Sequence, residues 1–106
     1  MTGLKNDGYG TTTPKLRYSL IPPDALEELV KVLEYGAKKY SPDNWKEVEN
    51  LSDRYYDAAI RHLEARRRGE KLDESGLLHS AHALCSVLFL VWKDLHPETE
   101  PGLPLD

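Results

Sequence analysis

The apolar segment from Leu77 to Leu95 constrains the fold more than any other feature of this 106-residue chain. Its apolar side chains cover more than one face of the helix that their spacing predicts, so this helix needs burial on several sides. Two shorter amphipathic segments precede it, and two short helices can hardly surround a third. We therefore expect an all-α protein: a small bundle of three main helices that is completed by a second copy of the chain.

The first predicted helix begins at Pro22 and Pro23, which would end any preceding strand or helix. Pro23 followed by Asp24 suits a first helical turn, because that turn needs no proline amide and the carboxylate meets the positive end of the helix dipole. Apolar residues at spacings of three and four continue the pattern to near Tyr40. The turn-forming residues that follow predict a loop reaching to about Leu51.

The second predicted helix follows that loop. Ser52 is suited to cap its N-terminus, and its apolar face runs to about Arg68. Gly69 is well placed to end the helix in the left-handed conformation. After a short connection, Asp73 or Ser75 is expected to cap the third helix, and the short connection makes these two helices antiparallel neighbours.

The domain organisation follows from length and local composition. A chain of 106 residues has room for one modest core and is expected to form a single domain. Residues 1–14 are rich in glycine and threonine, which predicts a flexible arm. Three prolines after His96 predict an irregular tail over residues 96–106. Residues 15–95 then form the single α-helical domain.

Hydropathy and charge argue against several classes of protein. The longest apolar run, Leu84 to Trp92, is shorter than the ~20 residues that span a bilayer, so no membrane partner is expected. The polar N-terminus lacks a secretory signal and Cys85 has no second cysteine to pair with, which predicts a reducing, cytoplasmic setting. A net charge of −4 argues against nucleic acid as a partner but is compatible with a small anionic ligand.

Three histidines are candidates for a binding site. His79 and His82 are three residues apart, so on a helix they share one face and can bind one ion or one phosphate. Both interrupt an apolar segment, where a buried imidazole needs a polar partner. His62, on the facing helix, could join them. The alternative is that they are core histidines bonded to carbonyl oxygens and tyrosines, and the residues alone leave both interpretations open.

Two acidic residues lie at the start of the third predicted helix. Asp73 and Glu74 have an ordinary interpretation as capping groups, which contribute about 1 kcal/mol to helix stability. The functional alternative is a metal site, because a divalent cation that accompanies a triphosphate prefers oxygen ligands.

Three cations are candidates for binding phosphate oxygens. Arg61 could do so through its bidentate fork, and Lys38 and Lys39 as point charges. The alternative is that all three are simply solvated, as most surface cations are.

Aromatic residues cluster around the first predicted loop. Tyr35, Tyr40 and Trp45 could stack on a base, and the amide of Asn44 could bond its edge. The alternative for these aromatic residues is a packing role in the core.

Several short motifs occur in a fixed order over residues 14–92, and the ordered set is far more specific than any one of them. They are Leu16-Arg17-Tyr18-Ser19-Leu20-Ile21-Pro22-Pro23, Tyr35-Gly36-Ala37-Lys38-Lys39-Tyr40, Asn44-Trp45, Arg61-His62-Leu63, Gly69-Glu70 and Asp73-Glu74-Ser75-Gly76-Leu77-Leu78-His79-Ser80-Ala81-His82-Ala83. This set resembles a widespread bacteriophage family, the N-terminal domain of dATP/dGTP diphosphohydrolase. The resemblance implies a relative of MazZ and, more distantly, of the MazG-type all-α nucleotide pyrophosphohydrolases.

The resemblance implies a metal-dependent hydrolase that uses Mg²⁺ or Mn²⁺ to release pyrophosphate from purine nucleoside triphosphates, giving dNMP from dATP or dGTP. In that chemistry the metals neutralise the phosphates and activate an attacking water. A phage-encoded protein of this kind would act in the host cytoplasm. The roles we expect are catalysis by His62, Asp73 and Glu74, metal binding by His79, His82 and Asp73, and nucleotide binding by Tyr35, Lys39, Tyr40, Asn44, Trp45 and Arg61.

One departure from the wider group keeps two alternatives open. The MazG type carries paired Glu-x-x-Glu and Glu-x-x-Asp motifs, whereas this chain has no clear copy of either and has His79-x-x-His82 at the corresponding part of its last helix. The first alternative is therefore a non-catalytic phage protein that binds and sequesters a nucleotide. The second is a structural helical oligomer whose histidines belong to its core.

Overall fold

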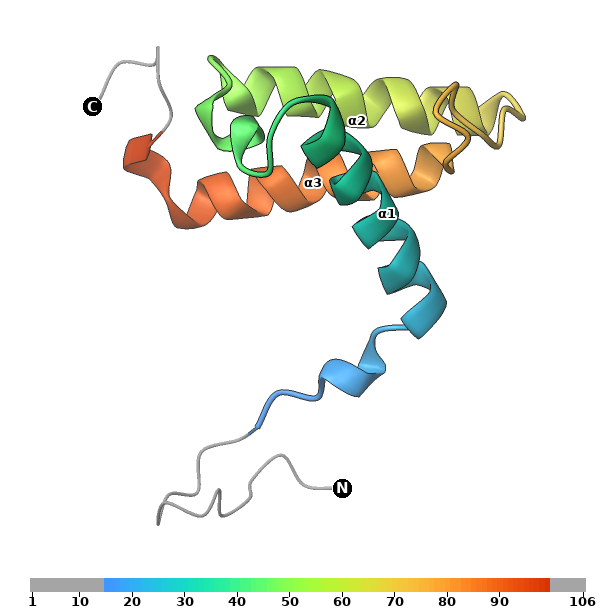
Figure 1. Cartoon of the computed structure of the whole chain (residues 1–106), viewed down its shortest axis with the longest axis horizontal. Coiled ribbons are helices and arrows are strands. Elements are labelled where there is room, and N and C mark those ends of the chain that lie inside the picture. The colour runs from blue at the N-terminus through green and yellow to red at the C-terminus, as the bar shows by residue number, and fades with distance from the viewer. Residues whose placement is uncertain (1–14, 100–106) are drawn as a thin grey trace.

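A computed structural model describes residues 15–99 of the protein, and three helices make up most of this part of the chain (Figure 1). They are α1 (Pro23–Lys39), α2 (Leu51–Arg67) and α3 (His79–Leu95), with short 3-10 turns η1 (Tyr18–Leu20), η2 (Asn44–Glu47) and η3 (Pro97–Thr99). Within the described residues there is no strand, only an isolated antiparallel bridge between Leu72 and Leu78. The predicted all-α class is confirmed.

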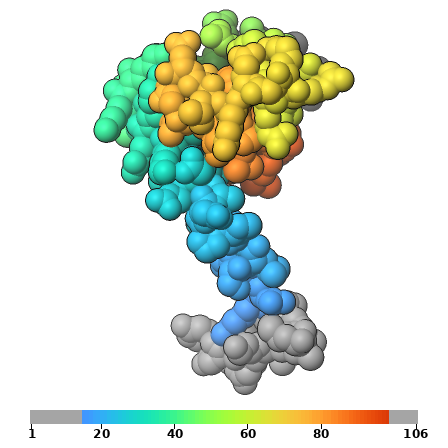
Figure 2. Space-filling view, turned by 90° about the vertical axis from the view of Figure 1, so that its right-hand side faces the viewer, coloured from blue at the N-terminus to red at the C-terminus, as the bar shows by residue number. Residues whose placement is uncertain are grey.

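Helices α2 and α3 form an antiparallel hairpin, and α1 crosses it near its own C-terminal end (Figure 1). The N-terminal half of α1, with η1 before it, stands away from the helical body (Figure 2). Accordingly Val32 is the one buried residue of α1. The site described below lies where the C-terminal part of α1 meets the hairpin.

The core joins all three helices around a small cluster of buried side chains. Val32 from α1 packs with Ala81, Cys85 and Phe89 from α3. Trp45, in η2, stacks on Phe89 with ring centroids 4.1 Å apart, so the loop after α1 is fixed to α3. Burial raises the pKa of the Cys85 thiol to about 11, which keeps it a neutral, small apolar side chain at physiological pH.

The predicted boundaries of α1 are confirmed, but the predicted cap of α2 is wrong. Ser52 is the second residue of α2, and Asn50 is its N-cap, in the left-handed conformation with φ 55°. Asparagine tolerates this conformation, and it turns the chain so that Leu51 becomes fully buried. At the other end Gly69 is left-handed as predicted, with φ 99°.

The hydrogen bonds after α2 explain why that helix stops there. The amide of Gly69 donates to the carbonyl of Arg66 at 2.9 Å, and the amide of Glu70 donates to the carbonyl of Ala65 at 3.0 Å. This pair of bonds is the Schellman arrangement, which satisfies the last free carbonyls of a helix and reverses the chain.

The predicted caps of α3 are also wrong. Helix α3 begins at His79 with Leu78 as its N-cap, so neither Asp73 nor Ser75 caps it. Instead Asp73 accepts a hydrogen bond from the amide of Ser75, and the chain then turns at Gly76 with φ 83°. An aspartate that bonds the amide two residues later favours a turn over a helical start.

Helix α3 was predicted to need burial on several sides, and in the single chain one of its apolar faces is left exposed. Several large apolar side chains on its outer face remain exposed in the single chain, namely Leu84, Val87, Leu88, Val91 and Leu95. Of the predicted segments, the arm over residues 1–14 lies outside the described residues, and the predicted tail is described only to residue 99, where it contains η3. None of the helices described is long and apolar enough to cross a membrane.

Candidate functional site

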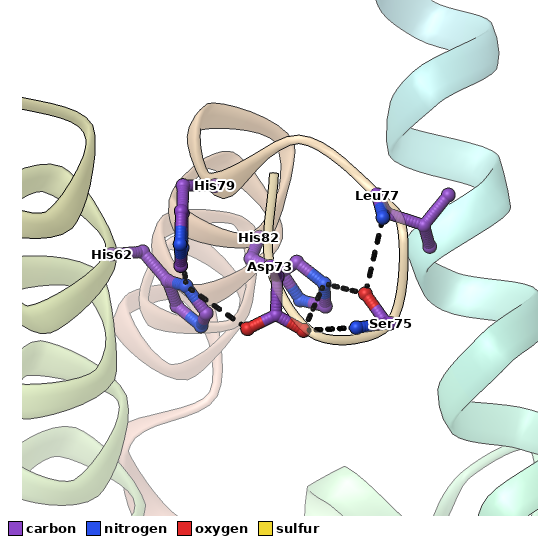
Figure 3. A network of polar contacts seen from close by, with 6 residues as sticks. All are labelled: His62, Asp73, Ser75, Leu77, His79 and His82. Carbon is purple, nitrogen blue, oxygen red and sulfur yellow. Dashed lines mark hydrogen bonds and ion pairs between the residues drawn. The ribbon is translucent and has the colours of Figure 1, made fainter. Parts of the chain in front are cut away.

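A self-bonded loop between α2 and α3 positions the acidic residue of the site. The amide of Asp73 donates to the carbonyl of Leu77 at 2.8 Å, and the amide of His79 donates to the carbonyl of Lys71 at 3.0 Å. These bonds close the loop across its base. The Asp73 side chain is thereby held over the gap between the two helices (Figure 3).

The side chain of Asp73 meets two histidines, one from each helix of the hairpin. Nδ1 of His62, on α2, lies 4.0 Å from Oδ1 of Asp73 and 2.8 Å from Nδ1 of His79, on α3 (Figure 3). In the absence of an ion, one of these nitrogens donates a hydrogen bond to the other. The ligand atoms of His62, Asp73 and His79 all lie within 4.8 Å of one another, and these residues are called the His/Asp cluster below.

His82 lies beside the cluster and contacts the other oxygen of the same carboxylate. Its Nε2 is 3.5 Å from Oδ2 of Asp73 and 2.8 Å from the hydroxyl of Ser75. Its ring stacks on that of His62, with centroids 4.7 Å apart and planes 12° apart. Asp73 and Ser75 both contact the same nitrogen of His82, so the three do not form the relay of a serine hydrolase, which needs opposite ring nitrogens.

The charge states of His62, His82 and Asp73 favour binding of a cation. Burial, together with neighbouring imidazoles, lowers the pKa of His62 and of His82 below the usual 6.5, so both are neutral near pH 7. Burial alone would raise the pKa of Asp73, but hydrogen bonds from the amide and hydroxyl of Ser75 outweigh it, and the pKa falls below 3.8. The site therefore offers free imidazole lone pairs beside a charged carboxylate.

These pKa shifts predict loss of stability in acid. As the pH falls through about 6.5, the unfolded chain protonates His62 and His82 while the folded chain still keeps them neutral, so the free energy of unfolding decreases. Asp73 contributes a further loss only below pH 3.8. We expect the melting temperature, measured with a chelator present, to fall between pH 7 and pH 5. The variant His62→Gln should show a flatter dependence, and an equally steep one would contradict the assignment.

A cleft of about 480 Å³ adjoins the cluster, between the C-terminal part of α1, η2 and the hairpin. His62, which belongs to the cluster, and His82 both line the cleft, whereas Asp73 and His79 do not. The remaining walls combine apolar and aromatic side chains with three cations and a few polar side chains. All of the side chains predicted to bind nucleotide line this cleft, namely Tyr35, Lys39, Tyr40, Asn44, Trp45 and Arg61.

The cleft is positively charged in a protein whose net charge is −4. Lys39, Arg54 and Arg61 line it, and no acidic side chain does. None of these cations forms an ion pair within the described part of the chain. Lys39 lies over the rings of Tyr35 and Tyr40, and a hydrogen bond with the Tyr40 hydroxyl is the main reason that its pKa is raised. Cations without acidic partners in an apolar cleft favour an anionic ligand.

The aromatic residues of the cleft divide into two kinds. Trp45 is half-buried and packs against Phe89 and Trp92, so one of its functions is to hold the core together. Tyr40 is 65% exposed and Tyr35 is 40% exposed, and Tyr35 also meets the edge of His82 at a centroid distance of 6.3 Å. These tyrosines are the aromatic surfaces free to contact a ligand.

The structure differs from the predicted site in two of its residues. The predicted metal set was His79, His82 and Asp73, whereas the closest grouping of ligand atoms contains His62 in place of His82. Glu74, predicted to be catalytic, is exposed and contacts neither the cluster nor the cleft, although its charge acts on Lys39.

Two residues of the site were missed by sequence reasoning. Arg54 lies seven residues before Arg61, two turns along the same face of α2, and this spacing could have identified it. Ser75 contacts His82 through a turn that no periodic pattern indicates.

The fold and the site define an all-α protein with a positively charged cleft that is lined in part by His62 of the His/Asp cluster. The chain belongs to the family described as dATP/dGTP diphosphohydrolase, N-terminal, whose family model matches residues 5–101. The resemblance in the ordered motifs is therefore confirmed. No solved structure matches the chain.

One curated relative is a Salmonella phage PMBT28 protein named dATP/dGTP diphosphohydrolase. It is 39% identical to this chain over 93 residues, which is 87% of this chain and 30% of the relative. The chain thus spans about a third of the length of the curated relative that it matches.

Proposed function

We propose that this domain acts on purine nucleoside triphosphates as a metal-dependent pyrophosphohydrolase, converting dATP or dGTP to dNMP and pyrophosphate. The observation that carries the proposal is the cleft with three cations, no acidic side chain and His62 of the His/Asp cluster in its lining. The printed name of the phage relative supports the same reaction class. We place the activity in the host cytoplasm.

Different residues of the cleft would bind the two parts of the nucleotide, the triphosphate and the base. The triphosphate would lie along Arg54 and Arg61 on α2, with Lys39 opposite them on α1. Arginine matches two phosphate oxygens at once, and lysine adds a point charge. The base would then lie toward Tyr40 and Asn44, where stacking and an amide can bind it.

The His/Asp cluster fits a divalent ion. Two ligands of one ion lie at most about 4.4 Å apart when each bond is about 2.2 Å, close to the separations found here. The two imidazoles and the charged carboxylate supply nitrogen and oxygen donors, a mixture that suits Mn²⁺ better than Mg²⁺. When bound, the ion would offset charge on the phosphates and make water more acidic. The residues we assign to it are His62, Asp73 and His79.

His82 is the residue we assign to proton transfer. It lines the cleft, it is neutral near pH 7, and its Nε2 is fixed by Ser75 and by Asp73. Water would add to the α-phosphorus as the bond to the α–β bridging oxygen breaks, and His82 would accept the proton that water loses. Pyrophosphate is then the leaving group.

The experiment is a panel of nucleotides with Mn²⁺ or Mg²⁺. We expect purine dNTPs to raise the melting temperature and to yield dNMP and pyrophosphate, detected by phosphate analysis and mass spectrometry. Binding with recovery of the intact nucleotide would replace this proposal with the sequestering alternative. If no nucleotide binds or reacts, the nucleotide-handling proposal fails and the structural oligomer remains.

Arg61 provides a sharper test of the cleft. Because a charge-assisted hydrogen bond contributes about 1.5–3 kcal/mol, Arg61→Ala should weaken binding of a non-hydrolysable dNTP analogue by about 10- to 100-fold. The matched control is Arg68→Ala, which removes an exposed arginine paired with Glu70 outside the cleft. Isothermal titration measures both variants. Equal affinities for them would place the triphosphate elsewhere.

A further inference from the structure

Gly36 lies inside helix α1, where glycine is among the least favoured residues. Its backbone does not require a glycine, because positive φ values among the described glycines occur only at Gly69 and Gly76. Nor does Gly36 end the helix, since α1 continues to Lys39 and its C-cap is Tyr40, whose amide donates to the carbonyl of Gly36 at 2.9 Å. Alanine would therefore suit this position of the helix better.

Packing within the chain does not require a glycine at this position either. A Cβ atom added to Gly36 would meet no heavy atom within 4 Å, apart from its chain neighbours and the backbone of its own helix. Gly36 is nevertheless half-buried, and it lines the cleft together with Ala37. The missing side chain therefore leaves room on the α1 wall of the cleft, and no described residue fills that room.

The neighbours of Gly36 along the helix show where this room lies. Val32, four residues earlier on the same face of α1, is buried in the core cluster against α3. Tyr40, four residues later, lines the cleft and is 65% exposed. Between a buried side chain and an exposed ring, the helix thus presents bare backbone to the cleft. A ligand can approach a backbone closely where no Cβ atom intervenes.

We propose that Gly36 forms the contact surface for the purine base, which lies against the bare backbone of α1 in space that any side chain would occupy. The inference rests on the function proposed above, which places the base toward Tyr40 and Asn44 and the triphosphate along Arg54 and Arg61. It adds a base-binding residue that has no side chain. Planar rings gain dispersion and stacking energy only at close contact, so a single methyl group at Gly36 would matter.

The first experiment compares the stability and the affinity of Gly36→Ala. Alanine favours the helix and meets no neighbour, so the melting temperature of the free protein should rise by about 2–8 °C. The added methyl group occupies the place of the base, so affinity for a non-hydrolysable dATP or dGTP analogue should fall about tenfold in isothermal titration. Unchanged affinity, or a Gly36→Ala protein that is less stable or unfolded, would overturn the proposal.

A ligand without a base separates the base from the phosphates. Inorganic tripolyphosphate offers the cations of the cleft a similar charge, so Gly36→Ala should bind it as the wild type does. Equal losses of affinity for tripolyphosphate and for the nucleotide analogue would place Gly36 beside the phosphates and would overturn its assignment to the base.

Gly69→Ala is the matched control variant. It adds the same methyl group to a glycine outside the cleft, where φ is 99° and a side chain is strained. This variant should lower the melting temperature and leave nucleotide affinity unchanged, the opposite pattern to that of Gly36→Ala. If both variants lose affinity equally, the effect does not come from the cleft and the proposal fails.

Nuclear magnetic resonance tests the contact without relying on a variant for affinity. The chain has seven glycines, so labelling glycine alone with ¹⁵N and ¹³C gives a simple spectrum, in which Gly36 is the signal missing from Gly36→Ala. The ring current of a bound base should shift the amide and α-proton signals of Gly36 most and those of Gly69 least. If the analogue binds and Gly36 does not shift, this inference fails while the proposed function stands. If the wild type binds no nucleotide, the proposed function itself fails.

Discussion

Replacing Asp73 by asparagine is expected to weaken Mn²⁺ binding at least 100-fold and to stop pyrophosphate release. Asp73 is the carboxylate of the His/Asp cluster, and a direct ligand should matter more than an outer-shell partner, whose loss costs 10- to 100-fold in metal affinity. Asparagine keeps the shape and can still accept the hydrogen bond from the amide of Ser75. Isothermal titration with Mn²⁺ alone measures the change without depending on catalysis.

The neighbouring acid provides the control. Glu74→Gln removes the same charge one residue away, at an exposed position outside the cluster. It should leave Mn²⁺ affinity unchanged. If Glu74→Gln loses the metal and Asp73→Asn retains it, then Glu74 binds the metal and the His/Asp cluster is not the metal site.

Replacing Trp45 by alanine is expected to lower the free energy of unfolding by about 3 kcal/mol, the low end of the range for buried aromatic positions, because Trp45 is half-buried. Trp45 stacks on Phe89 and meets the edge of Trp92, so its loss opens a cavity where η2 is fixed to α3. Urea denaturation followed by circular dichroism measures the change. Trp45→Phe should recover most of the stability, because it retains a ring against Phe89.

Tyr40 separates stability from binding. It lines the same cleft but is 65% exposed, so Tyr40→Ala should change the free energy of unfolding by less than about 0.5 kcal/mol. Because base–aromatic stacking contributes about 1–3 kcal/mol, the same variant should bind a purine dNTP analogue about tenfold more weakly. A large loss of stability in Tyr40→Ala would show that this ring also belongs to the core.

The helices were predictable because periodicity and end signals agree locally. Pro23 and Gly69 fix helix ends through backbone chemistry that does not depend on the rest of the chain. The capping predictions at Ser52 and Asp73 failed because each residue can bond its own neighbourhood in more than one way. Which way prevails depends on packing, such as the burial of Leu51.

The sequence predicted which types of residue form the site, but not which of the histidines lie together in the fold. The six predicted nucleotide-binding side chains share one cleft because the C-terminal part of α1, the loop with η2 and the middle of α2 meet there. His62 pairs with His79 because of how α2 is rotated about its axis relative to α3. The spacing of residues within one helix cannot predict this rotation. Family membership supports the general class of function, and the roles of individual residues are what the experiments above test.

The way in which α1 is attached has a consequence for affinity. One wall of the cleft is formed by the C-terminal end of α1, a helix with only one buried residue, Val32, whereas Arg54 and Arg61 belong to the α2–α3 hairpin. A ligand that bridges the two walls would restrain α1, and part of its interaction energy would go into that ordering. Measured affinities would then understate the strength of the contacts. Substitutions far from the cleft that secure α1 on the hairpin would tighten binding without touching the ligand.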